Sequence, residues 1–166
     1  MDTQRLFTNL FGSWFQLARH FPPAVLDAVA TTVSEGEATH RGELRVAIEA
    51  RLPPGAVLEG VTARDRAAML FSHLRVWDTE DNCGVLLYVL LAEHRIEIVA
   101  DRGIAKLVGV PEWEAITSHM RDEFARGRFR EALQTGVAEA GALLARHFPG
   151  DGTRRANELP DRPLVL

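Results

Sequence analysis

The 166-residue chain has a single cysteine, Cys83, which excludes an internal disulfide and a cysteine-based zinc site. Basic charge is also scarce, because 19 Lys and Arg residues stand against 23 Asp and Glu residues. The resulting net charge of −4 argues against a nucleic-acid-binding protein. The longest apolar run, Gly84–Ala92, is far shorter than the roughly 20 residues that span a bilayer. The N-terminus has no signal-peptide pattern, so we expect a cytoplasmic protein without a transmembrane segment.

Sequence motifs of several common enzyme classes are missing as well. The chain contains no Walker phosphate-binding loop, no G-x-G-x-x-G dinucleotide fingerprint and no G-x-S-x-G nucleophile elbow. What remains is 46% hydrophobic and 25% charged, which is typical of one soluble globular domain. Composition alone therefore predicts the class of protein and leaves its function open.

Hydrophobic periodicity predicts five helices and three strands. Residues 43–50 alternate between apolar and polar side chains, which indicates a half-buried strand, whereas residues 84–91 are continuously apolar and indicate a strand buried on both faces. Residues 96–99 follow the short turn at Glu93 and His94 and form the return strand of a hairpin. Helical spacing is found in residues 3–19, 24–35, 63–76, 112–125 and 129–147.

The order of these elements predicts an α/β protein. A strand, a crossover helix and a second strand form a βαβ unit, and the third strand adds an antiparallel hairpin. We expect a three-layer α/β/α sandwich around this small mixed sheet, with an extra N-terminal amphipathic helix. The polar segment from Pro149 is expected to lie over the surface or to be loose.

The topology brings three polar loops to one edge of the sheet. The two parallel strands begin at the same edge, and the third strand ends there, so residues 39–43, 78–84 and 101–103 are expected to meet. These loops concentrate oxygen-bearing side chains and one imidazole, which suit Ca²⁺ or Mg²⁺. The alternative is that they are solvated turn residues, since Asp and Asn favour turns. The candidate metal ligands are Asp81, Asp101, Asp78, Asn82 and His40.

The N-terminal helix carries an unusual aromatic load. Phe7, Phe11 and Trp14 recur at helical spacing and either pack on the domain itself or form a surface for a partner protein or a second copy. Cys83 lies at the start of a strand and no C-x5-R loop follows it. We interpret it as a small buried residue rather than a nucleophile.

The stretch DNCGVLLYVLLAEHRIEIVADRGI, residues 81–104, resembles the TPM-domain family, as does FARGRFREALQTGV, residues 124–137. That family includes YgcG-like bacterial proteins and relatives involved in photosystem II repair in the thylakoid lumen. The resemblance covers about residues 24–148 and implies an α/β/α domain. By position it assigns Asp81, Asn82, Asp101 and Gly103 to loops where some members bind divalent cations. We therefore divide the chain into the N-terminal helix, 1–21, a TPM-like domain, 22–148, and a C-terminal tail, 149–166.

The resemblance leaves two functions open. The first is a non-catalytic binding module that assists a partner protein. The resemblance implies that this partner can be a membrane-anchored relative, which would place the present chain at the periphery of the inner membrane. The second is a divalent-metal-dependent phosphohydrolase, because acid phosphatase activity has been proposed for plant members. In that reading Asp81 and Asp101 hold the metal, and Asp78 or His40 acts as the general base.

Overall fold

The computed structural model describes residues 5, 7–9, 14–152 and 157–166. Its elements follow one another in the order expected from the sequence, with three short additions, α4, α6 and β4. The elements are α2 (Trp14–His20), α3 (Pro23–Glu37), β1 (Glu43–Glu49), α4 (Pro54–Leu58), α5 (Ala63–His73), β2 (Gly84–Leu90), β3 (Arg95–Ala100), α6 (Arg102–Ala105), α7 (Val110–Ala125), α8 (Phe129–His147) and β4 (Leu164–Val165).

The four strands form one mixed sheet in the order β3-β2-β1-β4. Strands β1 and β2 are parallel and begin together, with Glu43 opposite Gly84. Strand β3 runs back along β2, so that Ala100 lies opposite Val85. The expected βαβ unit and hairpin are therefore confirmed. The starts of β1 and β2 lie at the same edge of the sheet as the end of β3.

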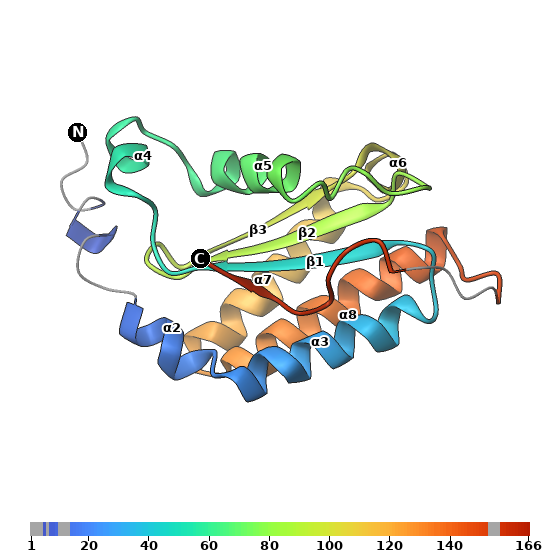
Figure 1. Ribbon diagram of the computed structural model, residues 1–166, viewed down its shortest axis with the longest axis horizontal. Helices are drawn as coiled ribbons and strands as arrows, with labels where there is room; N and C mark the ends of the chain where they lie inside the picture. The colour runs from blue at the N-terminus through green and yellow to red at the C-terminus, as the bar shows by residue number, and fades with distance from the viewer. Residues whose placement is uncertain (1–4, 6, 10–13, 153–156) are drawn as a thin grey trace.

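Helices cover both faces of the sheet (Figure 1). Helices α3, α7 and α8 lie on one face and enclose the larger core, which includes Val46, Leu87 and Leu144. Helix α5 lies on the other face over a smaller core around Leu86 and Tyr88. The three-layer α/β/α sandwich is confirmed. No helix in the described ranges combines the length and apolar character needed to cross a bilayer.

Strand β1 is buried along its whole length, so the expectation of a half-buried strand is wrong. Its polar side chains do not face water because α5 and the C-terminal tail cover them. The carboxylate of Glu49 accepts hydrogen bonds from the Tyr88 hydroxyl at 2.7 Å and from Arg66 at 2.8 and 2.9 Å. Glu49 is polar in the sequence, but these three hydrogen bonds satisfy its carboxylate and allow it to be buried in the core.

Several helix boundaries differ from the expected ones for identifiable reasons. Helix α3 continues through Gly36 to Glu37, two residues beyond the expected end at residue 35. Helix α7 begins at Val110 because Pro111 fits the first turn of a helix. Helix α5 begins at the expected residue 63, where the Thr62 hydroxyl and the Asp65 carboxylate form a capping box. The expected helix over 3–19 is described only in part, with α2 as its last section.

The C-terminal tail is an edge strand rather than a loose segment. Strand β4 pairs in parallel with β1, and Leu166 exchanges backbone hydrogen bonds with Ile48 and Ala50. The buried side chain of Leu159 joins the smaller core. The sequence showed only a polar stretch with two prolines, which gave no signal for so short a strand.

Candidate functional site

The three polar loops meet at one edge of the sheet, as the topology predicts. We call residues 39–43, 78–84 and 101–103 the rim. Arg41 Nη1 donates to Asp81 Oδ2 at 3.0 Å and joins the first loop to the second. The amide of Gly103 donates to the Asn82 carbonyl at 2.9 Å and joins the second loop to the third. The rim is thus one contiguous surface built from distant parts of the sequence.

Close backbone packing holds the second and third loops together. An ideal Cβ at Gly103 would lie 2.3 Å from the carbonyl oxygen of Asn82 and 2.9 Å from that of Asp81. Only glycine allows this approach, and it brings two backbone carbonyls against the first turn of α6. The rim therefore contains main-chain oxygens in addition to its carboxylates, and that of Asn82 already accepts the Gly103 amide.

Asp101 is the buried carboxylate of the rim. It is 7% exposed and caps α6, with Oδ1 accepting from the Arg102 amide at 2.7 Å. Its Oδ2 is buried and has no hydrogen-bond partner in the described part of the chain. Leaving such an oxygen unpaired is costly, so this atom is the place at the rim where a cationic ligand would gain most.

Asp81 and Asn82 lie in the loop that adjoins the Asp101 loop, and arginines already engage both side chains. Asp81 pairs with Arg41, and Asn82 Oδ1 accepts from Arg102 Nε and Nη2 at 3.3 and 3.2 Å. Asn82 also has a φ of 52°, which its residue type tolerates in a tight turn. The rim therefore contains both acceptors and two guanidinium groups.

His40 and Asp78 belong to the same loops but lie differently. His40 is 6% exposed and its Nδ1 lies 2.9 Å from the Gly42 carbonyl. Its Nε2 lies close to Gly36 of α3 and Gly141 of α8, so the ring is turned toward the helices, and burial lowers the pKa of this imidazole. Asp78 is exposed in its turn. Among the candidate ligands, Asn82 is linked to the loop of Asp101 through Arg102 and Gly103.

Sequence reasoning missed the two arginines of the rim. Arg41 directly follows His40 and Arg102 directly follows Asp101, so each lies beside a residue that was considered. The signal that could have identified them is the position of each arginine next to a candidate ligand, in loops that were expected to meet. With both arginines in place, no group of three or more His, Cys, Asp or Glu side chains in the described ranges is arranged to hold a metal ion.

Cys83 belongs to the second loop of the rim, and its side chain is fully buried. Its thiol donates to the Arg41 carbonyl at 3.5 Å, and burial together with the nearby Asp81 charge raises its pKa to about 12. The thiol is therefore neutral at physiological pH, as the interpretation of a small buried residue requires.

We expect Cys83 in the native protein to react at least tenfold more slowly with a disulfide reagent such as DTNB at pH 8 than in denaturant, because only the thiolate attacks. The measurement is thiol release followed at 412 nm. The same protein in guanidinium chloride provides the control with full exposure. Equal rates in both conditions would contradict a buried, protonated thiol.

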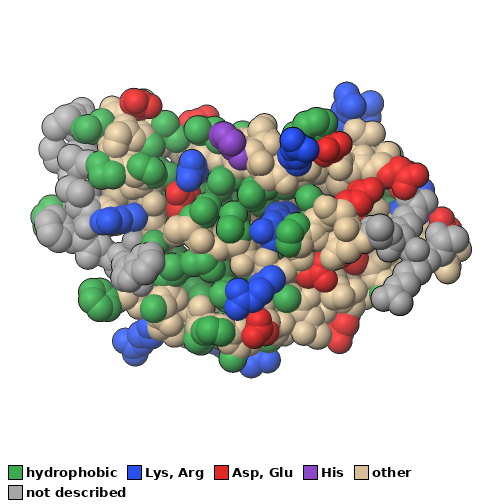
Figure 2. Space-filling model, viewed as in Figure 1, with side chains coloured by type: hydrophobic (Ala, Val, Ile, Leu, Met, Phe, Trp, Pro, Cys, Tyr) green, Lys and Arg blue, Asp and Glu red, His purple; other side chains and the backbone are tan. Residues whose placement is uncertain are grey.

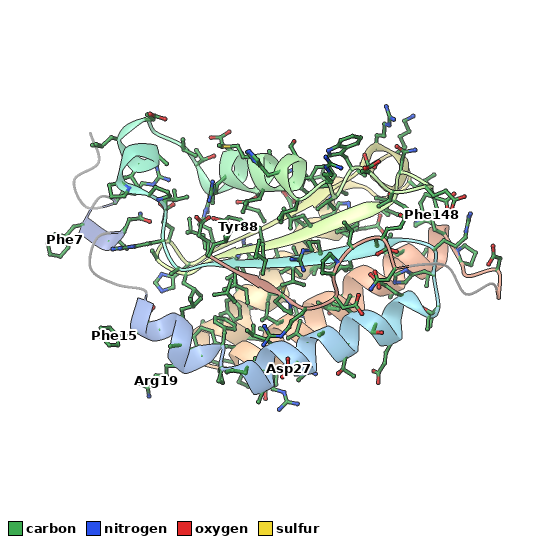
Figure 3. The ribbon with its side chains drawn as sticks, in the orientation of Figure 1. Phe7, Phe15, Arg19, Asp27, Tyr88 and Phe148 are labelled. Atoms are coloured by element: carbon green, nitrogen blue, oxygen red, sulfur yellow. The ribbon has the colours of Figure 1, made fainter. Side chains whose placement is uncertain are left out.

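The aromatic surface proposed for a partner is described only in part. Phe7 is 64% exposed and Phe15 is 89% exposed. Both rings project from the same end of the molecule (Figure 3). Phe11 and the side chain of Trp14 lie outside the described residues. The prediction of a partner surface at Phe7, Phe11 and Trp14 therefore remains a prediction, with Phe15 as an addition.

Comparisons with known proteins agree with the architecture. The solved NMR structure of the BA42 protein from the psychrophilic bacterium Bizionia argentinensis superposes with a TM-score of 0.74 at 26% sequence identity, covering 86% of this chain and 92% of that chain. A search of curated proteins gave no significant match. The family model of the TPM domain matches residues 16–143, which is most of the chain. This chain therefore belongs to the TPM domain family.

Proposed function

We propose that this chain is a non-catalytic TPM-domain binding module that takes a divalent cation, Ca²⁺ or Mg²⁺, at the rim and assists a partner protein. The observation that carries the proposal is Asp101 Oδ2, a buried carboxylate oxygen without a hydrogen-bond partner among the described residues. A hard cation satisfies such an oxygen and offsets the buried negative charge.

The neighbouring groups have the chemistry that hard cations prefer. Asp81 supplies a second carboxylate, and the carbonyl oxygens of Asp81 and Asn82 pack against Gly103. Calcium accepts carboxylate, carbonyl and water oxygens in a flexible shell, so a site need not consist of three carboxylates. Cation binding competes with Arg41 for Asp81, which makes the salt bridge between them a part of the proposed site.

The side chains of the rim favour binding over hydrolysis. Covalent catalysis needs a nucleophile activated by a neighbouring base. The Cys83 thiol is buried with its pKa raised to about 12, and the His40 imidazole is enclosed by α3 and α8. For the phosphohydrolase alternative, Asp78 is the remaining proposed general base. Its side chain is exposed, and no hydrogen bond from another described residue orients it.

Partner binding is proposed at the end of the molecule that carries Phe7 and Phe15, because exposed aromatic side chains are enriched in protein interfaces. The predicted surface of Phe7, Phe11 and Trp14 belongs to the same N-terminal segment. The chemistry of this surface favours an apolar partner face, and the membrane-anchored relative suggested by the family resemblance is one such partner.

The cation is tested by thermal unfolding of the full chain with added CaCl₂ or MgCl₂. A ligand at a hundred times its dissociation constant stabilises by about 2.7 kcal/mol, so Tm is expected to rise by about 5–10 °C. We expect Asp101→Asn to abolish this rise, because the amide keeps the cap on Arg102 but removes the charge. Asp122→Asn, at an exposed position of α7, is the matched control and keeps the rise.

Two outcomes count against the proposal. A Tm that does not change with either cation would overturn the metal site, as would an equal rise in the Asp101→Asn variant. The same samples are assayed for hydrolysis of p-nitrophenyl phosphate with and without chelator. Turnover that disappears in Asp101→Asn would establish the phosphohydrolase instead of the non-catalytic module.

A further inference from the structure

A cavity of about 520 Å³, largely open to solvent, lies at the β4 edge of the sheet, between α2, α3 and the C-terminal strand. One wall consists of apolar side chains of the N-terminal helices, including Leu17 and Phe21, and the other includes Leu164 and Val165 of β4. In Figure 2 apolar side chains gather on this face with basic side chains beside them. The volume lies within the range of small-molecule sites in proteins.

Two arginines contribute to the otherwise largely apolar lining. Arg45 comes from β1 and is 7% exposed, which is unusual for a guanidinium. Arg162 comes from the tail and pairs with Asp27 of α3 at 2.9 Å. One cavity therefore combines hydrocarbon walls with a buried positive group and a second positive group that is half-exposed.

The Arg45 guanidinium has hydrogen-bonding capacity to spare. Its Nη1 donates to the carbonyl oxygens of Pro160 and Arg162 at 2.7 and 2.5 Å. Its Nε and Nη2 make no hydrogen bond within the described ranges, although a guanidinium carries five N–H donors. Asp161, whose charge acts on Arg45, is bonded to Asn157 and to Glu37. The buried charge of Arg45 therefore has no carboxylate in direct contact in the described structure.

We propose that this cavity binds a long-chain carboxylate, with the alkyl chain against the apolar walls and the carboxylate on Arg45. A guanidinium fork matches a carboxylate with two parallel hydrogen bonds. A neutral hydrocarbon would leave the donors of Arg45 unsatisfied, and a small inorganic anion would leave the apolar walls exposed. The site is separate from the rim and does not depend on the proposed cation.

The test is calorimetric titration of the full chain with dodecanoate, 1-dodecanol and phosphatidylglycerol vesicles. We expect dodecanoate to bind with one-to-one stoichiometry and dodecanol to bind at least about tenfold more weakly, which corresponds to the loss of one charged contact. Vesicles free of fatty acid are expected not to bind. Equal affinity for the acid and the alcohol, binding of vesicles alone, or no binding of dodecanoate would each overturn the proposal.

Two variants separate the cavity from the fold. Ala18 of α2 lies in the lining, and its side chain is exposed. Ala18→Trp therefore fills the cavity and is expected to abolish dodecanoate binding without lowering Tm. Gln16→Trp, on the same helix and not part of the lining, keeps wild-type affinity. Arg45→Gln is expected to weaken dodecanoate about tenfold and leave dodecanol unchanged. Arg45 also bonds the C-terminal tail, so Arg45→Gln can unfold the protein; in that case Ala18→Trp alone tests whether this cavity binds dodecanoate. Undiminished dodecanoate binding by Ala18→Trp excludes this cavity.

Discussion

Replacing Gly84 by alanine is expected to destabilise the protein by about 3–5 kcal/mol. An ideal Cβ at this position would lie 1.9 Å from the carbonyl oxygen of Val76, and backbone cannot move aside as a flexible side chain can. Gly84 also begins β2, and its carbonyl accepts the Asp101 amide at 2.8 Å. The substitution therefore forces apart the segment before β2 and the strand that carries the rim.

The measurement is chemical unfolding in guanidinium chloride with the midpoint and slope both fitted. Gly55→Ala in α4 is the matched control, because nothing lies within 4 Å of its ideal Cβ, and alanine favours a helix. That variant is expected to be as stable as the wild type or slightly more so. A Gly84→Ala protein within about 1 kcal/mol of the wild type would show that the close approach to Val76 is not required.

The second large effect is expected at Glu37, where replacement by glutamine stabilises the protein at neutral and alkaline pH. Burial, with the nearby Glu43 and Asp161 carboxylates, raises the pKa of Glu37 to about 8 in the folded state. Its carboxyl accepts the Leu44 amide at 3.0 Å and lies in hydrogen-bonding contact with Asp161 of the tail. Glutamine keeps the acceptor and cannot ionise.

The sign follows from the raised pKa. The stabilising contribution of protonated Glu37 is complete below the unfolded pKa of about 4.5 and is lost as the pH rises toward 8. The advantage of Glu37→Gln should therefore be small at pH 4.5, grow with pH, and level off at about 4–5 kcal/mol by pH 9, above the folded pKa. Unfolding curves at pH 4.5, 7 and 9 measure it. The exposed Glu35→Gln on the same helix is the control, and a pH-independent difference would refute the raised pKa.

The fold was predictable where hydrophobic spacing and topology rules are strong. The continuous run from Gly84 gave β2, and the Glu93–His94 turn gave the hairpin with β3. Parallel pairing of β1 and β2 then required the three loops to meet, as the Arg41–Asp81 and Gly103–Asn82 contacts show. Whether they hold a cation is a question of chemistry that topology does not answer.

The rest depended on contacts that no local pattern encodes. Helix α4 was missed because Pro53, Pro54 and Gly55 indicate a break, although proline also fits the first turn of a helix. The burial of Glu49 depends on Arg66 and Tyr88, each on a different element. The orientation of His40 depends on Gly36 and Gly141, which are about a hundred residues apart in the sequence.

The tail that supplies β4 has a consequence for how this domain can be isolated. The TPM match ends at residue 143, whereas the partner strand of β1 lies at Leu164–Val165. A shortened protein cut at the family boundary would expose the backbone donors and acceptors of Ile48 and Ala50 that now bond to Leu166. Open strand edges of this kind promote self-association, so solubility of the isolated domain rests on residues 164–166, which lie beyond the family match.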